Sequence, residues 1–129
     1  MLVFVLGGCT RPDPRIAYVQ QEAQAAADYY GFGLDATKLN VAFVGLPDNP
    51  GEWHVRGMVP WPNTILLAEE FPKPPWVPEL RETVAHEVVH LMQGARVGYG
   101  NWIPWYLANR KAAEAEAYDM AAKWRRSVE

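Results

Sequence analysis

Two histidines stand four residues apart in the segment His86-Glu87-Val88-Val89-His90. Residues at this spacing on an α-helix lie on one face, one turn apart, so both imidazoles can reach a single metal ion. Imidazole nitrogens bind zinc at about 2.0–2.1 Å, and a tetrahedral ion then has two further places to fill. Glu87 can take a proton from a water molecule that the metal activates. The spacing therefore predicts a metal site with His86 and His90 as ligands and Glu87 as catalytic base.

The residues around this motif favour a ligand role for the two histidines. The pattern H-E-x-x-H is the one found on the active-site helix of zinc metallopeptidases. Burying two imidazoles and a carboxylate without partners would cost several kcal/mol, and a bound metal removes that cost. The alternative is a core helix with two hydrogen-bonded histidines. The neighbours that predict a helix buried on most sides are Val84, Ala85, Val88, Val89, Leu91 and Met92.

A third protein ligand has to come from another part of the chain. Gln93 and Arg96 occupy the places, three and six residues after His90, where the metzincin class has glycine and histidine, so that class is excluded. The remaining histidine, His54, falls in an expected strand beside Trp53, and we interpret it as a non-ligand. The third ligand is therefore expected to be a carboxylate.

The last predicted helix offers two carboxylates, Glu114 and Glu116. Glu114 lies on the flank shared with Ala121, close to the apolar stripe. Glu116 lies on the flank shared with Asp119 and Lys123, which we expect to be solvated. We favour Glu114 as the third ligand and keep Glu116 as the alternative. The apolar stripe consists of Ala113, Ala117, Met120 and Trp124.

In these two motifs the chain resembles the gluzincin class of zinc metallopeptidases, which includes thermolysin-like zincins and minimal gluzincins. In that class a downstream glutamate helix completes the zinc site, often in a Glu-x-x-Ala-Asp type of pattern. Residues 114–118, EAEAY, are similar to that pattern, with Tyr118 where Asp or Asn is frequent. Asp119, one position later, is then the candidate to hold the first histidine. The resemblance covers roughly residues 39–124 in the order of elements.

The resemblance implies a fold and a reaction. The fold is α+β and zincin-like, with a small antiparallel or mixed sheet, an N-terminal helix, the H-E-x-x-H helix and a C-terminal glutamate helix. The reaction is hydrolysis of peptide bonds in a peptide or protein substrate, with Zn²⁺ as cofactor held by His86, His90 and Glu114. The alternative is a zincin-like metal-binding module without turnover, serving a structural or interaction role, for example in an envelope or virion assembly.

The transition state of peptide hydrolysis also needs a donor for its developing oxyanion. Tyr99 and Tyr106 both fall between the two helix motifs, in a region where thermolysin-like relatives place a tyrosine. We prefer Tyr106 as this second catalytic residue. The alternative is an aromatic side chain that packs with Trp102 and Trp105.

The elements that must position these residues can be read from caps and periodicity. Asp13 and Pro14 open a helix over 15–30, which Gly31 and Gly33 end. The strand at 64–68 directly precedes the active-site helix, and we expect it to be the sheet edge on which an extended peptide lies. The other expected elements are strands at 39–46 and 53–59, a helix over 78–94, a loop over 97–103, and a last helix from near 104 or 109 to about 126.

Composition limits the remaining function classes. The chain has 129 residues, 50% of them hydrophobic, and we expect residues 13–129 to form one zincin-like domain. A net charge of −3 without a Lys/Arg block argues against a nucleic-acid partner. The one cysteine excludes a disulfide framework within the chain and Cys-rich zinc modules.

Residues 1–12 contain a second motif. The run Leu6-Gly7-Gly8-Cys9 resembles the lipobox of bacterial lipoproteins, followed by a short polar tether. This interpretation predicts a protein outside the cytoplasm whose membrane contact is a lipid at Cys9. The alternative is a short N-terminal strand with an inert cysteine in a cytoplasmic protein.

Overall fold

The N-terminal helix α1 (Pro14–Tyr30) begins and ends where its capping residues predict. In the computed structural model, which describes residues 13–46, 57–76 and 78–129, the Asp13 side chain accepts a hydrogen bond from the backbone N–H of Arg15 at 2.9 Å. Gly31 takes the left-handed conformation, with φ 75°, and ends the helix. The buried face of α1 consists of Val19, Ala23, Ala26 and Ala27.

A short 3-10 turn, η1 (Ala36–Lys38), leads from α1 into a small mixed sheet. Among the described residues the strand order is β2 (Asn40–Val44), β4 (Thr64–Ala68), β3 (Gly57–Met58). Strand β2 runs parallel to β4, and β3 runs antiparallel to it. The α+β class and the small sheet are thus confirmed, and the sheet is of the mixed kind.

The expectation that β4 is the sheet edge is wrong. Strand β4 lies between β2 and β3, and both Ile65 and Leu67 are fully buried. The run TILLA is nearly continuously apolar, which suits a strand covered on both faces. In the described part of the chain, the edge closest to the H-E-x-x-H helix is β3, which contacts that helix.

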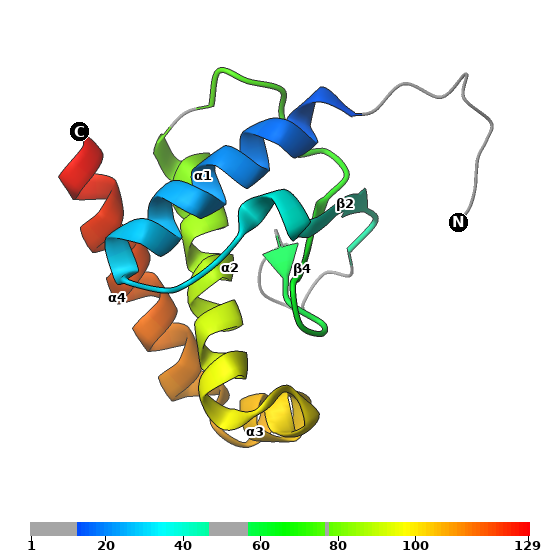
Figure 1. Ribbon diagram of the computed structural model, residues 1–129, viewed down its shortest axis with the longest axis vertical. Helices are drawn as coiled ribbons and strands as arrows, with labels where there is room; N and C mark the ends of the chain where they lie inside the picture. The colour runs from blue at the N-terminus through cyan, green and yellow to red at the C-terminus, as the bar shows by residue number, and fades with distance from the viewer. Residues whose placement is uncertain (1–12, 47–56, 77) are drawn as a thin grey trace, which may run out of the picture.

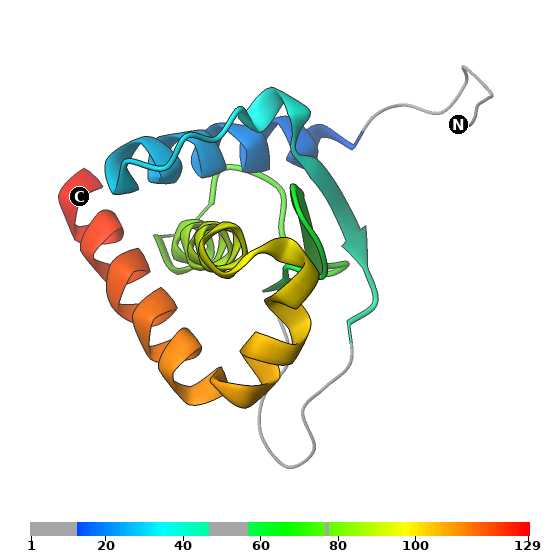
Figure 2. The same ribbon diagram turned by 60° about the horizontal axis from the view of Figure 1, so that its bottom comes forward.

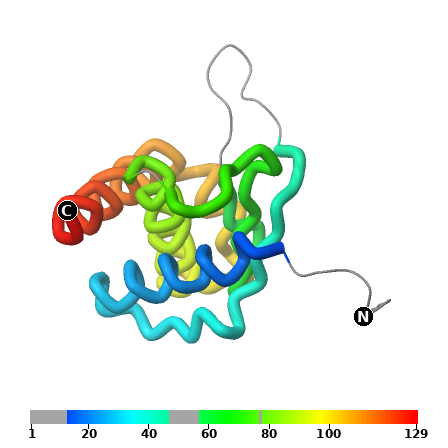
Figure 3. The backbone as a smooth tube through the Cα atoms, turned by 90° about the horizontal axis from the view of Figure 1, so that it is seen from above, coloured from blue at the N-terminus to red at the C-terminus, as the bar shows by residue number. Residues whose placement is uncertain are grey.

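The H-E-x-x-H helix, α2 (Pro78–Val97), occupies the centre of the molecule. Figure 2, which looks nearly along α2, shows it surrounded by α1, the sheet, α3 (Trp102–Ala108) and α4 (Arg110–Val128). Figure 1 shows α1 crossing over α2 with α4 alongside, and Figure 3 shows α2 between α1 and α4. This central position explains why the helix is apolar on most sides.

Two boundaries in the helical half differ from the sequence prediction. Helix α2 continues three residues beyond Gly94, because this glycine does not end the helix but makes room for the ring of Tyr99. The last helix, α4, begins directly after Asn109, which confirms the later of the two expected starts, whereas residues 102–108 form a separate helix, α3. Residues 99–101 form the 3-10 turn η2 (Tyr99–Asn101), in what was expected to be a loop.

One core joins α1, the sheet, α2 and α4. Trp124 of α4 is the largest fully buried side chain, and it belongs to the same cluster as Leu67 of β4 and Leu91 of α2. The lipobox-like run with Cys9 and the expected strand residue His54 lie outside the described residues. Within the described part, no helix combines the length and the apolar character needed to cross a membrane.

Candidate metal centre

Helices α2 and α4 bring the two motif histidines and one carboxylate together. His86 and His90 project from one face of α2, and Glu114 reaches them from the first half of α4. One ligand atom from each of the three residues lies within 4.8 Å of the other two. These three residues could hold a metal ion. The structure therefore joins the histidines with Glu114, the carboxylate that we favoured from its helical phase.

The donor atoms converge closely. His86 Nε2 lies 2.9 Å from Glu114 Oε1, and His90 Nε2 lies 3.1 Å from Glu114 Oε2. The two Nε2 atoms are 3.1 Å apart. Each imidazole thus presents the same ring nitrogen to a shared point. The side chains are largely shielded from solvent, with exposed fractions of 12% for His86, 6% for His90 and 23% for Glu114.

Glu87 lies beneath strand β3. Its side chain is buried, and its Oε1 atom has no hydrogen-bond partner among the described residues. A Cβ atom on Gly57 of β3 would lie 2.9 Å from Glu87 Oε2, so the strand passes directly over the carboxylate. A buried polar atom without a partner requires an explanation, and a catalytic role is one of the common explanations.

The charges around the site set the ionisation of its carboxylates. Burial raises the pKa of Glu87, although the neighbouring histidines partly offset this effect. Burial would also raise the pKa of Glu114. The hydrogen bonds from His86, His90 and Tyr106 outweigh that effect and hold the pKa of Glu114 well below its usual range. Glu114 is therefore an anion at neutral pH, as a metal ligand must be.

Tyr106 of α3 also reaches the site. Its hydroxyl donates a hydrogen bond to Glu114 Oε2, and its ring centroid lies 5.6 Å from that of His90. Burial and the Glu114 carboxylate raise the pKa of this phenol, which keeps the hydroxyl protonated. Its ring also packs against Trp102. The role of Tyr106 as oxyanion donor stays a prediction, and the structure adds Glu114 as its partner.

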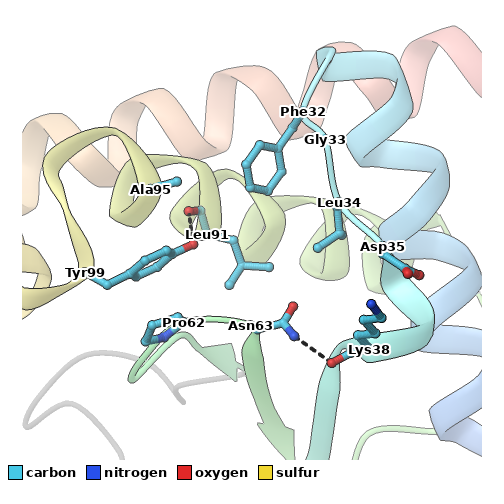
Figure 4. A pocket seen from close by; sticks show the side chains of 10 residues that line it. All are labelled: Phe32, Gly33, Leu34, Asp35, Lys38, Pro62, Asn63, Leu91, Ala95 and Tyr99. Atoms are coloured by element: carbon cyan, nitrogen blue, oxygen red, sulfur yellow. Dashed lines mark hydrogen bonds between the residues drawn. The ribbon is translucent and has the colours of Figure 1, made fainter.

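The other tyrosine between the motifs, Tyr99, has a different position. Its hydroxyl donates to the carbonyl oxygen of Leu91 at 2.8 Å, and its ring covers Gly94. It also lines a cavity of about 330 Å³ between residues 32–38, which follow α1, the turn at Pro62 and Asn63, and the second half of α2 (Figure 4). None of the three candidate metal ligands lines that cavity.

The expected partner of the first histidine is wrong. Asp119 is largely exposed and forms an ion pair with Lys123 at 3.1 Å. One position earlier, the ring of Tyr118 lies 4.5 Å from that of His86, in an edge-on arrangement. The helical phase of α4 explains this difference, since it leaves Asp119 exposed and brings Tyr118 beside the ring of His86.

Glu116 is partly exposed, with 37% of its side chain accessible, and it has partners that the sequence did not suggest. It accepts hydrogen bonds from Gln93 and Arg96, both at 2.8 Å. Gln93 in turn contacts Nδ1 of His90 at 2.8 Å. Sequence reasoning missed this contact, although Gln93 follows His90 by three residues, a spacing at which helical side chains are neighbours.

Comparisons with protein-family models, with curated proteins and with solved structures find no match to this chain. The α+β class and the candidate metal-binding group therefore rest on the residues and geometry of the chain itself. Membership of the gluzincin class and a zincin-like topology stay predictions from the two helix motifs.

Proposed function

We propose that this protein is a zinc-dependent metallopeptidase in which His86, His90 and Glu114 hold the metal and Glu87 acts as general base. The observation that carries the proposal is a buried carboxylate, Glu87, that has one oxygen without a partner among the described residues and whose pKa responds to the charges of His86, His90 and Glu114. A site built only for structural metal would have no need of this additional buried acid.

The donor set fits zinc. Two imidazoles and one glutamate are a known ligand combination of catalytic zinc, which keeps a fourth position open for water or substrate. Ligand atoms on a tetrahedron with bonds of about 2.05 Å stand roughly 3.3 Å apart. The separations between donor atoms here, 2.9 and 3.1 Å, are close to that value. Small shifts of the side chains would accommodate the ion.

The chain's own residues then supply the proton transfers. Zinc, when bound, lowers the pKa of water and polarises a substrate carbonyl. Glu87 accepts the proton of the attacking water and delivers it to the leaving amine. Because burial raises the pKa of Glu87, its carboxyl can retain that proton between the two transfers. Tyr106 offers a protonated hydroxyl at the same site.

Strand β3 offers a place for an extended peptide. It is an edge strand of the described sheet, and only its β4 side is paired. An unpaired strand edge binds extended peptides by backbone hydrogen bonds. Gly57 of this strand covers Glu87, so a peptide added to β3 would pass close to the base. The proposed substrate is accordingly an unfolded or extended segment of a protein.

A comparison of wild type with Glu87→Gln tests the proposal. We expect the wild type to bind one zinc ion and to cleave unfolded casein, with activity lost on chelation and restored by zinc. Glu87→Gln should bind zinc equally well and lose about 10²- to 10⁴-fold in rate. Glu79→Gln, on the exposed first turn of α2, is the matched control and should remain active.

The outcomes separate the candidate functions. A wild-type chain that binds zinc but cleaves neither casein nor a peptide library would support the metal-binding module without turnover. Full activity in Glu87→Gln would exclude Glu87 as the base. A chain that binds no divalent ion at all would overturn the metal site itself.

A further inference from the structure

Gln93 is a fully buried amide between α2 and α4. Its Oε1 atom lies 2.8 Å from Nδ1 of His90. Its Nε2 atom donates to the carbonyl oxygen of Ala113 at 3.0 Å and to Glu116 Oε1 at 2.8 Å. Every one of these contacts is a hydrogen bond, and together they connect the metal centre to α4.

The partners of this amide allow only one orientation. The Gln93 Nε2 atom faces the carbonyl oxygen of Ala113 and a carboxylate oxygen of Glu116, and neither of these oxygens can donate a hydrogen bond. Rotating the amide by 180° would bring its oxygen against both acceptors. The Gln93 oxygen must therefore face His90. Since that oxygen only accepts, Nδ1 of His90 has to carry a proton.

We propose that Gln93 is a positioning residue that accepts the Nδ1–H of His90 and so fixes the imidazole ring with Nε2 directed at the metal position. A neutral imidazole carries one proton, so protonation at Nδ1 leaves Nε2 free to bind. Nε2 is the atom that faces His86 and Glu114. The inference rests on the proposed metal site and deepens it, because it assigns the residue that prepares one ligand.

Glu116 and Arg96 complete this arrangement. Arg96 donates to Glu116 Oε1 at 2.8 Å, and the pair is partly exposed, with side-chain exposures of 54% and 37%. The ion pair holds the Glu116 carboxylate where the Gln93 amide can donate to it. Glu116, which the sequence analysis kept as the alternative metal ligand, thus helps to orient His90 through Gln93.

The hydrogen bond can be measured in the zinc-loaded protein. When Nε2 of His90 binds the ion, the one remaining ring proton is on Nδ1, and ¹H–¹⁵N spectra of the labelled protein show whether that proton is protected from exchange with water. We expect a protected Nδ1–H signal of His90 in wild type and its loss in Gln93→Met. Glu116→Ala, at a partly exposed position, should loosen the amide and speed the exchange, whereas Glu116→Gln keeps an acceptor and should preserve the wild-type signal.

Zinc affinity provides the second measurement. With zinc alone as probe, in competition with a chelating dye, Gln93→Met should raise the Kd by about ten- to a hundredfold, as loss of such outer partners does. Val84→Ala removes packing from the buried face of the same helix and is the matched control for lost stability. It should leave both the protected Nδ1–H signal and the zinc affinity unchanged.

The proposal is overturned if Gln93→Met keeps the protected Nδ1–H signal and the wild-type zinc affinity, or if Val84→Ala changes both equally. If Gln93→Met does not fold, the comparison of Glu116→Ala with Glu116→Gln decides the question. A wild-type protein that binds zinc and shows the protected Nδ1–H signal but cleaves no peptide would contradict the peptidase and leave the role of Gln93 intact.

Discussion

At the scale of single residues, Glu87 depends on a neighbour that has no side chain. Gly57 lets strand β3 approach so closely that a Cβ atom would lie 2.9 Å from Glu87 Oε2 and 3.0 Å from its Cδ. The end of a glutamate side chain is flexible and can move away. A methyl group at this position would therefore displace the proposed base and cost little stability.

We expect Gly57→Ala to lower kcat by at least about tenfold, because small displacements of a catalytic group have large effects on rate. Its melting temperature and zinc Kd should stay near the wild-type values. Gly45→Ala is the control, since a Cβ atom there would meet nothing within 4 Å. An unchanged kcat in Gly57→Ala would argue against a defined position of Glu87 in the reaction.

Tyr106 has two available roles, and one substitution distinguishes them. Its hydroxyl is bonded to Glu114, so we expect Tyr106→Phe to weaken zinc binding by about tenfold through loss of an outer partner of that ligand. The zinc Kd and the kcat of the zinc-saturated enzyme should be measured together. A lower kcat at an unchanged Kd would assign the hydroxyl to the substrate, as the sequence analysis predicted.

At the scale of elements, α2 and η2 fit together through Gly94. A Cβ atom at this position would lie 2.5 Å from Tyr99 Cε1 and 2.9 Å from Cδ1. The aromatic ring is rigid, and its hydroxyl is fixed by a hydrogen bond to the Leu91 carbonyl. The Tyr99 ring therefore cannot move aside for a Cβ atom at position 94, whereas the flexible Glu87 side chain can move aside for one at position 57.

Gly94→Ala should consequently destabilise the protein. Alanine gains about 1 kcal/mol in helix propensity over glycine, but overpacking costs typically 1–3 kcal/mol. We expect a net loss in the free energy of unfolding, measured by urea titration. In a Tyr99→Ala background the ring is absent, and the same substitution should become stabilising. If Gly94→Ala stabilised the wild type, the close packing of Tyr99 on α2 would be incorrect.

At the scale of the whole molecule, the proposed zinc ion would connect two helices. His86 and His90 belong to α2, whereas Glu114 belongs to α4. A ligand that binds only the folded chain adds to its stability by mass action. Free zinc at a hundred times its Kd should therefore raise the free energy of unfolding by about 2.7 kcal/mol.

Thermal unfolding with zinc and with chelator measures this contribution. The melting temperature of wild type should fall on chelation, and that of His86→Ala/His90→Ala should not respond. Gln93→Met should show the zinc effect only at higher zinc concentrations. A wild-type melting temperature that is indifferent to zinc would contradict a metal ion between α2 and α4.

Local sequence alone determined several parts of this protein. Asp13 and Gly31 set the ends of α1 because caps act through hydrogen bonds to nearby backbone groups. The four-residue spacing of His86 and His90 placed them on one face of α2 for a similar reason, since helical geometry is local. The apolar run at 64–68 was a strand with the predicted bounds.

Only the tertiary structure decided which partner each of these residues meets. The central place of β4, the passage of Gly57 over Glu87 and the continuation of α2 past Gly94 all depend on contacts between separate elements. Likewise, the register of α4 against α2 brought Glu114 to the histidines and Glu116 to Gln93. Such contacts depend on how whole faces of helices and strands pack together, and a short stretch of sequence does not determine that packing.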